Sequence, residues 1–161
     1  MRKYCEECEK EVETKIITKK ENYKVCGEQI EVAAQILVCE ECGEELFCEK
    51  LDSATLVNAY NEYRRKHKLL LPEEIKKIRE QYGLSQRNFA KLLNWGDKTI
   101  CRYENGYIQD KAHNSILLFL REPENMRTYL TENENIIDEK QKTKLLNTVE
   151  VLEYVGSYNP S

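Results

Sequence analysis

The sequence predicts an α+β protein in which a small, β-rich, zinc-binding domain precedes an all-helical domain. Two C-x-x-C pairs stand near the N-terminus, residues between them alternate between apolar and polar side chains, and later apolar residues recur at helical spacing. A chain of 161 residues has room for two such domains and not for one large enzyme. We expect domains at 1–66 and 67–131, followed by a helical extension at 132–161.

The four cysteines Cys5, Cys8, Cys39 and Cys42 have the spacing of a structural zinc site. Each pair can reach one metal ion from a tight turn, and two turns supply a closed tetrahedral shell with no open position for catalysis. Metal binding would supply much of the folding free energy of so small a domain, roughly 10–16 kcal/mol apparent for structural zinc in finger peptides. We expect one zinc ion per chain. Thioredoxin-like redox chemistry is the alternative for a C-x-x-C motif, but it uses one motif in a βαβ setting.

The segment between the cysteine pairs is predicted to form a β-hairpin. Residues 12–24 and 28–38 alternate loosely in polarity, and Cys26-Gly27-Glu28 is the candidate bend. The positions expected to be strand-like are Ile16, Thr18, Ile30, Val32, Ile36 and Val38.

Cys26, Cys48 and Cys101 stand outside the two pairs. We expect them to be small buried hydrophobic side chains, with Cys48 in a strand and Cys101 on the inner side of a helix. Cys26 is also an alternative metal ligand. The two histidines, His67 and His113, are isolated, and we interpret both as surface or packing residues.

A helix is predicted from about residue 54 to residue 66. Its basic end, residues 64–68, suits the negative end of a helix dipole, and contact with a nucleic-acid phosphate is the alternative interpretation. The side chains expected on its apolar side are Leu56, Val57, Tyr60 and Tyr63.

The segment 75–106 has the pattern of a helix-turn-helix motif. A first helix at 73–82 would end at Gly83, and Ser85 would cap a second helix. A turn at 94–96 leads to a third helix. Any three-helix bundle would show the same periodicity, so the prediction of DNA binding depends on which side chains point outward. The side chains expected to point inward are Phe89, Ala90, Leu92, Leu93, Ile100, Cys101 and Tyr103.

The third helix, which would open at Asp97 or Lys98, leaves Lys98, Thr99 and Arg102 on its outer face. A short helix, a tight turn and a polar-faced second helix are the parts of a motif that enters the major groove of DNA. Lys and Arg pair with guanine edges and phosphates. These three residues are therefore candidate DNA contacts.

Charge is spread unevenly along the chain, whose net charge is −4. Residues 1–67 hold 11 basic and 15 acidic side chains, a net of −4. Residues 68–131 hold 11 and 8, a net of +3, and the remaining tail holds 3 and 6, a net of −3. The only basic segment is therefore the one with the helix-turn-helix pattern, which supports nucleic-acid binding there.

Helices are also predicted behind the motif, at 115–120, 123–130 and 138–155, with 131–137 polar and loose. The last helix is amphipathic, and packing within the chain is one explanation of its apolar side. Pairing of two subunits is the other, and we expect a homodimer through residues 112–155. The apolar side consists of Leu145, Leu146, Val149, Leu152 and Val155.

No apolar run approaches the length of a membrane span, and no signal-peptide pattern follows Met1. We therefore expect a cytoplasmic protein with no membrane partner. In a reducing compartment, seven cysteines argue for metal ligation or burial before disulfides.

The order of these parts resembles the MqsA/YgiT family of antitoxins, in which a zinc domain precedes an Xre-type, lambda-repressor-like helix-turn-helix domain. The resemblance covers about residues 1–131, through both cysteine pairs and the sequences EEIKKIREQYGLSQRNFAKLL and W-G-x-x-T-I-x-R-Y-E-N-G. It implies that Gln86 holds a phosphate and that Arg102 reads a base. Lys98 stands where the best-studied pattern has a base-reading asparagine, which implies a different operator sequence.

The resemblance implies an antitoxin that is not an enzyme. Its zinc domain would bind and neutralise a protein toxin, which in the prototype is an mRNA-cleaving ribonuclease. Its C-terminal domain would dimerise on a palindromic operator and repress its own operon. The alternative is a phage or metabolic transcriptional regulator with a zinc interaction module and no toxin. A zinc- or thiol-dependent enzyme is a third hypothesis, but the chain lacks an open metal site, a Cys–His pair at readable spacing and a phosphate loop.

Overall fold

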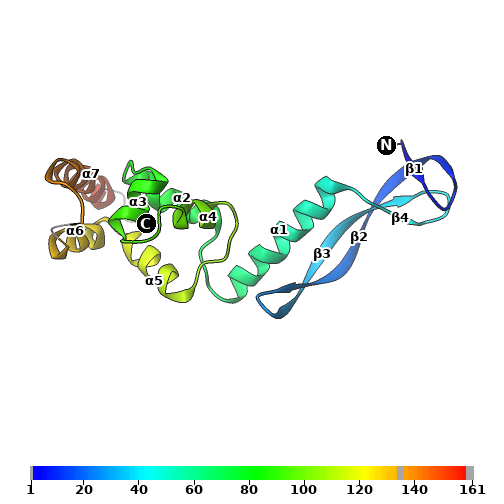
Figure 1. Ribbon diagram of the computed structural model, residues 1–161, viewed down its shortest axis with the longest axis horizontal. Coiled ribbons are helices and arrows are strands. Elements are labelled where there is room, and N and C mark those ends of the chain that lie inside the picture. Colours follow the sequence, from blue (N-terminus) through cyan, green and yellow to red (C-terminus); the bar gives the residue numbers. More distant parts are fainter. Residues whose placement is uncertain (1, 134–135, 159–161) are drawn as a thin grey trace. The chain divides into compact units, whose positions relative to one another are not determined.

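A computed structural model describes residues 2–133 and 136–158 of the chain (Figure 1). The chain divides into two compact units, Met1–His67 and Lys68–Ser161, here called the N-terminal and C-terminal units. In the described residues, the first holds an antiparallel sheet and one helix and the second only helices, so the predicted α+β class is confirmed. Residues 134–135 and 159–161 of the expected extension 132–161 lie outside the described part. None of the helices in the described residues is long and apolar enough to span a membrane.

Four antiparallel strands form the sheet of the N-terminal unit, in the order β1-β2-β3-β4. Their bounds are β1 Arg2–Cys5, β2 Lys10–Val25, β3 Glu28–Cys39 and β4 Glu45–Leu46. The two long strands form the expected hairpin, joined by the two-residue turn Cys26-Gly27. Both turn residues have positive φ, 49° and 85°, which suits the twist of a tight hairpin.

The hairpin buries mainly the residues of β3, among them Ile30, Val32 and Ala34. Ile16 lies in β2, as expected, but its side chain is 56% exposed. Helix α1 (Glu49–Lys66) packs chiefly on β3 and much less on β2, which explains why the middle of β2 is left uncovered.

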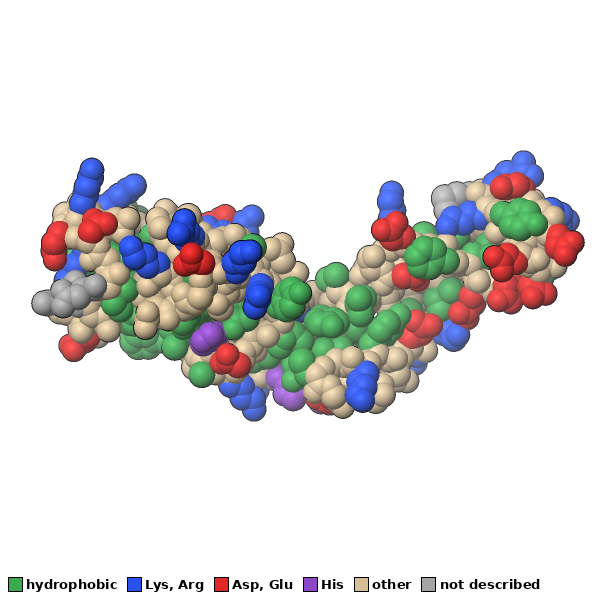
Figure 2. Space-filling model, in the orientation of Figure 1, with side chains coloured by type: hydrophobic (Ala, Val, Ile, Leu, Met, Phe, Trp, Pro, Cys, Tyr) green, Lys and Arg blue, Asp and Glu red, His purple; other side chains and the backbone are tan. Residues whose placement is uncertain are grey.

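Helix α1 starts five residues earlier than expected, because the Asp52 carboxylate accepts the Cys48 backbone N–H at 3.1 Å. Its buried side holds Ala59, and the small side chain suits close packing on the sheet. On the expected apolar side of the helix, Leu56 and Val57 are 46% and 60% exposed. Figure 2 shows hydrophobic side chains exposed along α1 and the hairpin.

The cysteines outside the two pairs are not fully buried, contrary to expectation. Cys26 is exposed at the hairpin turn, while Cys48 and Cys101 are partly buried. Cys48 lies beyond β4 as the N-cap residue of α1 and not in a strand.

The described part of the C-terminal unit consists of six helices around one hydrophobic core. Their bounds are α2 Pro72–Gln81, α3 Gln86–Leu92, α4 Thr99–Glu104, α5 Lys111–Leu120, α6 Pro123–Glu132 and α7 Glu139–Tyr158. Gly83 ends α2 with a φ of 64°, and the Ser85 hydroxyl caps α3 by accepting the Asn88 N–H at 3.1 Å. The segment α2–α4 thus has the predicted elements.

The last helix, α7, belongs to this core through Leu145 and Val149. A bidentate ion pair between Arg127 of α6 and Glu153 of α7 holds the two helices together, with Nη2–Oε2 at 2.6 Å. Val155, on the expected apolar side of α7, is 54% exposed.

Candidate metal centre and nucleic-acid interface

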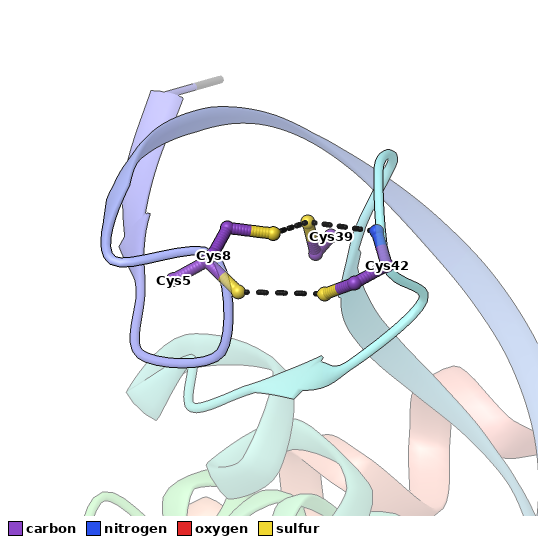
Figure 3. Close-up of side chains that lie close together, drawn as sticks. All are labelled: Cys5, Cys8, Cys39 and Cys42. Carbon is purple, nitrogen blue, oxygen red and sulfur yellow. Dashed lines mark hydrogen bonds between the residues drawn. The ribbon is translucent and has the colours of Figure 1, made fainter.

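Two turns of the N-terminal unit bring the predicted ligands Cys5, Cys8, Cys39 and Cys42 together (Figure 3). The first pair lies at and after the end of β1, and the second lies at and after the end of β3. Because β1 and β3 both pair with β2, the two turns lie at the same end of the sheet. Pairing of Cys5 with Lys10 and of Thr14 with Cys39 fixes this register.

The four sulfur atoms fit one tetrahedral metal ion. All four lie within 4.8 Å of one another, with Cys5–Cys42 at 3.5 Å and Cys8–Cys39 at 3.9 Å. A tetrahedral shell with metal–sulfur bonds of about 2.3 Å needs sulfur atoms about 3.8 Å apart. Cys26 is not among the clustered cysteines, so it is not a ligand here.

Backbone N–H groups favour a thiolate at this centre. The N–H groups of Glu41 and Cys42 lie 3.3 and 3.5 Å from the Cys39 sulfur. Those of Cys42 and then Glu41 lower the pKa of Cys39 to about 7. Hydrogen bonding with Cys42, followed by burial, raises the pKa of Cys8 to about 12. Four clustered thiols cannot all ionise without a cation, and a bound metal ion supplies that charge.

The candidate DNA contacts occupy one end of α4. Lys98 is the N-cap residue, Thr99 is the first helical residue, and Arg102 lies one turn on. Lys98 and Arg102 are exposed and Thr99 is partly buried, whereas Ile100 is fully buried against the core. The two cationic side chains of Lys98 and Arg102 are therefore exposed to solvent, while the opposite side of α4 is packed against the core through Ile100.

The fourth candidate, Gln86 at the start of α3, makes a contact that the sequence did not indicate. Its amide nitrogen donates to Glu104 Oε2 at 2.7 Å. Glu104 also forms a bidentate ion pair with Arg79, with Nε–Oε1 at 2.6 Å and Nη2–Oε2 at 3.0 Å. Arg79 in addition donates to the Leu84 carbonyl at 2.7 Å. This network links α2, α3 and α4, and it uses one of the two N–H groups of the Gln86 amide.

An aromatic cluster supports the other side of α4. Trp95, in the turn before α4, stacks on His113 with ring centroids 3.8 Å apart. The Tyr103 hydroxyl lies 2.6 Å from Nδ1 of His113. The other histidine, His67, lies 2.7 Å from Glu28. Both histidines are packing residues, as expected.

Comparison with protein-family models matches residues 3–132 to the antitoxin component of a bacterial toxin-antitoxin system, MqsA. The match includes both cysteine pairs and α2–α4 and ends with α6, before α7. No curated protein matches the chain.

Proposed function

The chain belongs to the MqsA antitoxin family, and from this premise we propose that it neutralises a protein toxin and represses its own operon. In this proposal the N-terminal unit binds the toxin. The C-terminal unit binds double-stranded operator DNA as a homodimer, and the operator is palindromic because the dimer is symmetric. The proposal is carried by one observation, a four-cysteine centre and an α2–α4 segment with exposed cations on a single short chain.

The metal in the proposed centre is zinc, in a structural role. Four thiolates and a tetrahedral spacing favour zinc and leave no position for a substrate, so we propose no enzymatic activity. The site fits the cytoplasm, where thiols stay reduced. Metal analysis of the purified chain should give one zinc ion per chain.

For DNA binding, α4 enters the major groove with Lys98 and Arg102 toward base edges, while Thr99 and Gln86 contact phosphates. Gln86 supports this role because Glu104 holds its amide at the start of α3. The basic balance of residues 68–131 adds attraction for the phosphate backbone.

The proposed DNA binding is tested by fluorescence anisotropy with the DNA upstream of the chain's own gene, at two salt concentrations. Lys98→Ala or Arg102→Ala should each cost about 1–3 kcal/mol on the operator and much less on unrelated DNA. Lys140→Ala, an exposed cation on α7, is the matched control. Equal losses on every DNA would assign these residues to phosphate, and no binding at low salt would refute the repressor role.

The proposed neutralisation of a toxin is tested by co-expression of the chain with the adjacent reading frame. The full chain should relieve growth inhibition caused by that frame's product and should purify as a complex with it. A chain with Cys39→Ser and Cys42→Ser should do neither, because the unit would lose its metal. If the neighbour is harmless and does not bind, the chain is a regulator without a toxin, and the antitoxin role fails.

A further inference from the structure

We propose that a cleft between α1 and the sheet of the N-terminal unit receives a lysine or arginine side chain of the protein toxin. This inference rests on the proposed function and assigns its contact surface. The cleft is open, has a volume of about 540 Å³, and lies beside β4 and the first turns of α1.

Part of the cleft wall is apolar and faces solvent. Phe47 and Leu56 are 75% and 46% exposed, and the partly buried Ile36 of β3 also lines the cleft. These exposed side chains contribute little to the core of the unit. An apolar patch that stays exposed is typical of a surface that binds a partner. The aliphatic stems of lysine and arginine pack well on such walls.

Three carboxylates line the same cleft, and no lysine, arginine or histidine does. Glu45 forms an ion pair of 2.7 Å with Lys19, and Lys19 is not one of the residues that line the cleft. Glu21 accepts the Tyr23 hydroxyl at 2.9 Å, and Asp52 accepts a backbone N–H. Among the ion pairs of residues 2–133 and 136–158, none involves Glu21 or Asp52. Lys19, which pairs with Glu45, interacts with Glu21 only through the longer-range Coulomb attraction, so neither carboxylate has a direct cationic partner.

Tyr23 fixes one of these carboxylates before a partner arrives. Burial, and then the hydrogen bond to Glu21, raise the pKa of the Tyr23 hydroxyl, so the phenol stays protonated and keeps donating. A carboxylate whose orientation is already set loses less conformational freedom on binding.

Other occupants fit this cleft poorly. DNA or RNA would bring phosphates toward three carboxylates, and like charges in contact oppose association. A wholly apolar ligand would cover the carboxylates and leave them without water or a partner, which is costly. A cation on an aliphatic stem satisfies both the walls and the charges.

The test compares two doubly substituted full-length chains, both zinc-loaded, by calorimetric titration with the product of the adjacent reading frame. Glu21→Gln with Asp52→Asn removes the two available cleft charges and should weaken binding at least about tenfold and flatten its salt dependence. Glu6→Gln with Glu11→Gln removes two exposed charges of the same unit outside the cleft and should stay within about twofold.

Equal affinity of the cleft variant and the native chain would overturn the cleft and leave the antitoxin role standing. Failure of the native chain to bind would overturn both. A titration of the ¹⁵N-labelled chain with a hexaarginine peptide gives a partner-independent result. Amide shifts should concentrate at Tyr23, Ile36 and Leu56 and vanish in the cleft variant; shifts spread evenly over the acidic cysteine turns would contradict the proposal.

Discussion

Removal of one partner from the Arg79–Glu104 pair should destabilise the C-terminal unit strongly. Their side chains are only 10% and 5% exposed, and two short contacts join them. Arg79→Met leaves the Glu104 carboxylate with only the Gln86 amide. Glu104→Leu leaves the buried guanidinium with only the exposed Glu80 carboxylate, at 3.5 Å, and the Leu84 carbonyl. Each substitution should lower the free energy of unfolding of the C-terminal unit by about 3–5 kcal/mol, the range for breaking a buried ion pair.

The double variant separates the pair from its surroundings. With both charges gone, no uncompensated charge stays buried, so Arg79→Met with Glu104→Leu should cost only about 0–2 kcal/mol. The sum of the two single costs would be about 6–10 kcal/mol, and the difference is the coupling of a double-mutant cycle.

Urea denaturation followed by tryptophan fluorescence measures these energies selectively. Trp95 is the only tryptophan of the chain and belongs to the C-terminal unit, so its signal reports that unit alone. The reasoning is refuted if the single costs fall below about 1 kcal/mol each or if they add in the double variant. A Lys76→Met substitution, which removes an exposed pair with Glu80 at 3.8 Å, should cost less than about 1 kcal/mol and serves as the control.

Three further results are expected. A strong chelator should abolish the strand signal of the N-terminal unit in circular dichroism without moving the Trp95 unfolding midpoint; a joint shift would contradict independent units. Tyr82→Phe should cost about 1–2 kcal/mol, because the carbonyl of Leu120 loses its 2.6 Å hydrogen bond in a buried place; an unchanged urea midpoint would contradict this. The hydrogen bond from Arg127 lowers the pKa of Glu153 in the folded chain. The ion pair therefore stabilises the fold at pH values above the unfolded-state pKa of Glu153, and this stabilisation is lost as the pH falls through the folded-state pKa. Glu153→Gln should therefore be less stable than the native chain at pH 7, by less than about 1 kcal/mol, and equal to it once pH lies below that value; a constant difference would refute the assignment.

Local signals explain what the sequence predicts well. Two cysteine pairs, a two-residue hairpin turn, Gly83 and the Ser85 cap are each specified within a few residues. The start of α1 was missed because Asp52 caps it from inside the helix.

Contacts between distant segments explain what the sequence did not show. The exposed side of α1 depends on which strand the helix covers, so helical periodicity alone does not show that Leu56 and Val57 are exposed. The contact between Gln86 and Glu104 joins residues 18 positions apart, and no spacing rule indicates it.

The packing of α7 has a consequence for how long the chain survives in a cell. Family similarity ends at residue 132, yet Leu145 and Val149 fill the core formed by the earlier helices. A protease cut between α6 and α7 would release a helix that carries two fully or nearly buried side chains, and each lost one costs about 2–5 kcal/mol when it leaves a cavity. Since whole domains are stable by only about 5–15 kcal/mol, a single cleavage there would commit the C-terminal unit to unfolding and degradation. The lifetime of the chain would then be set by a segment that lies outside the residues matched to the family.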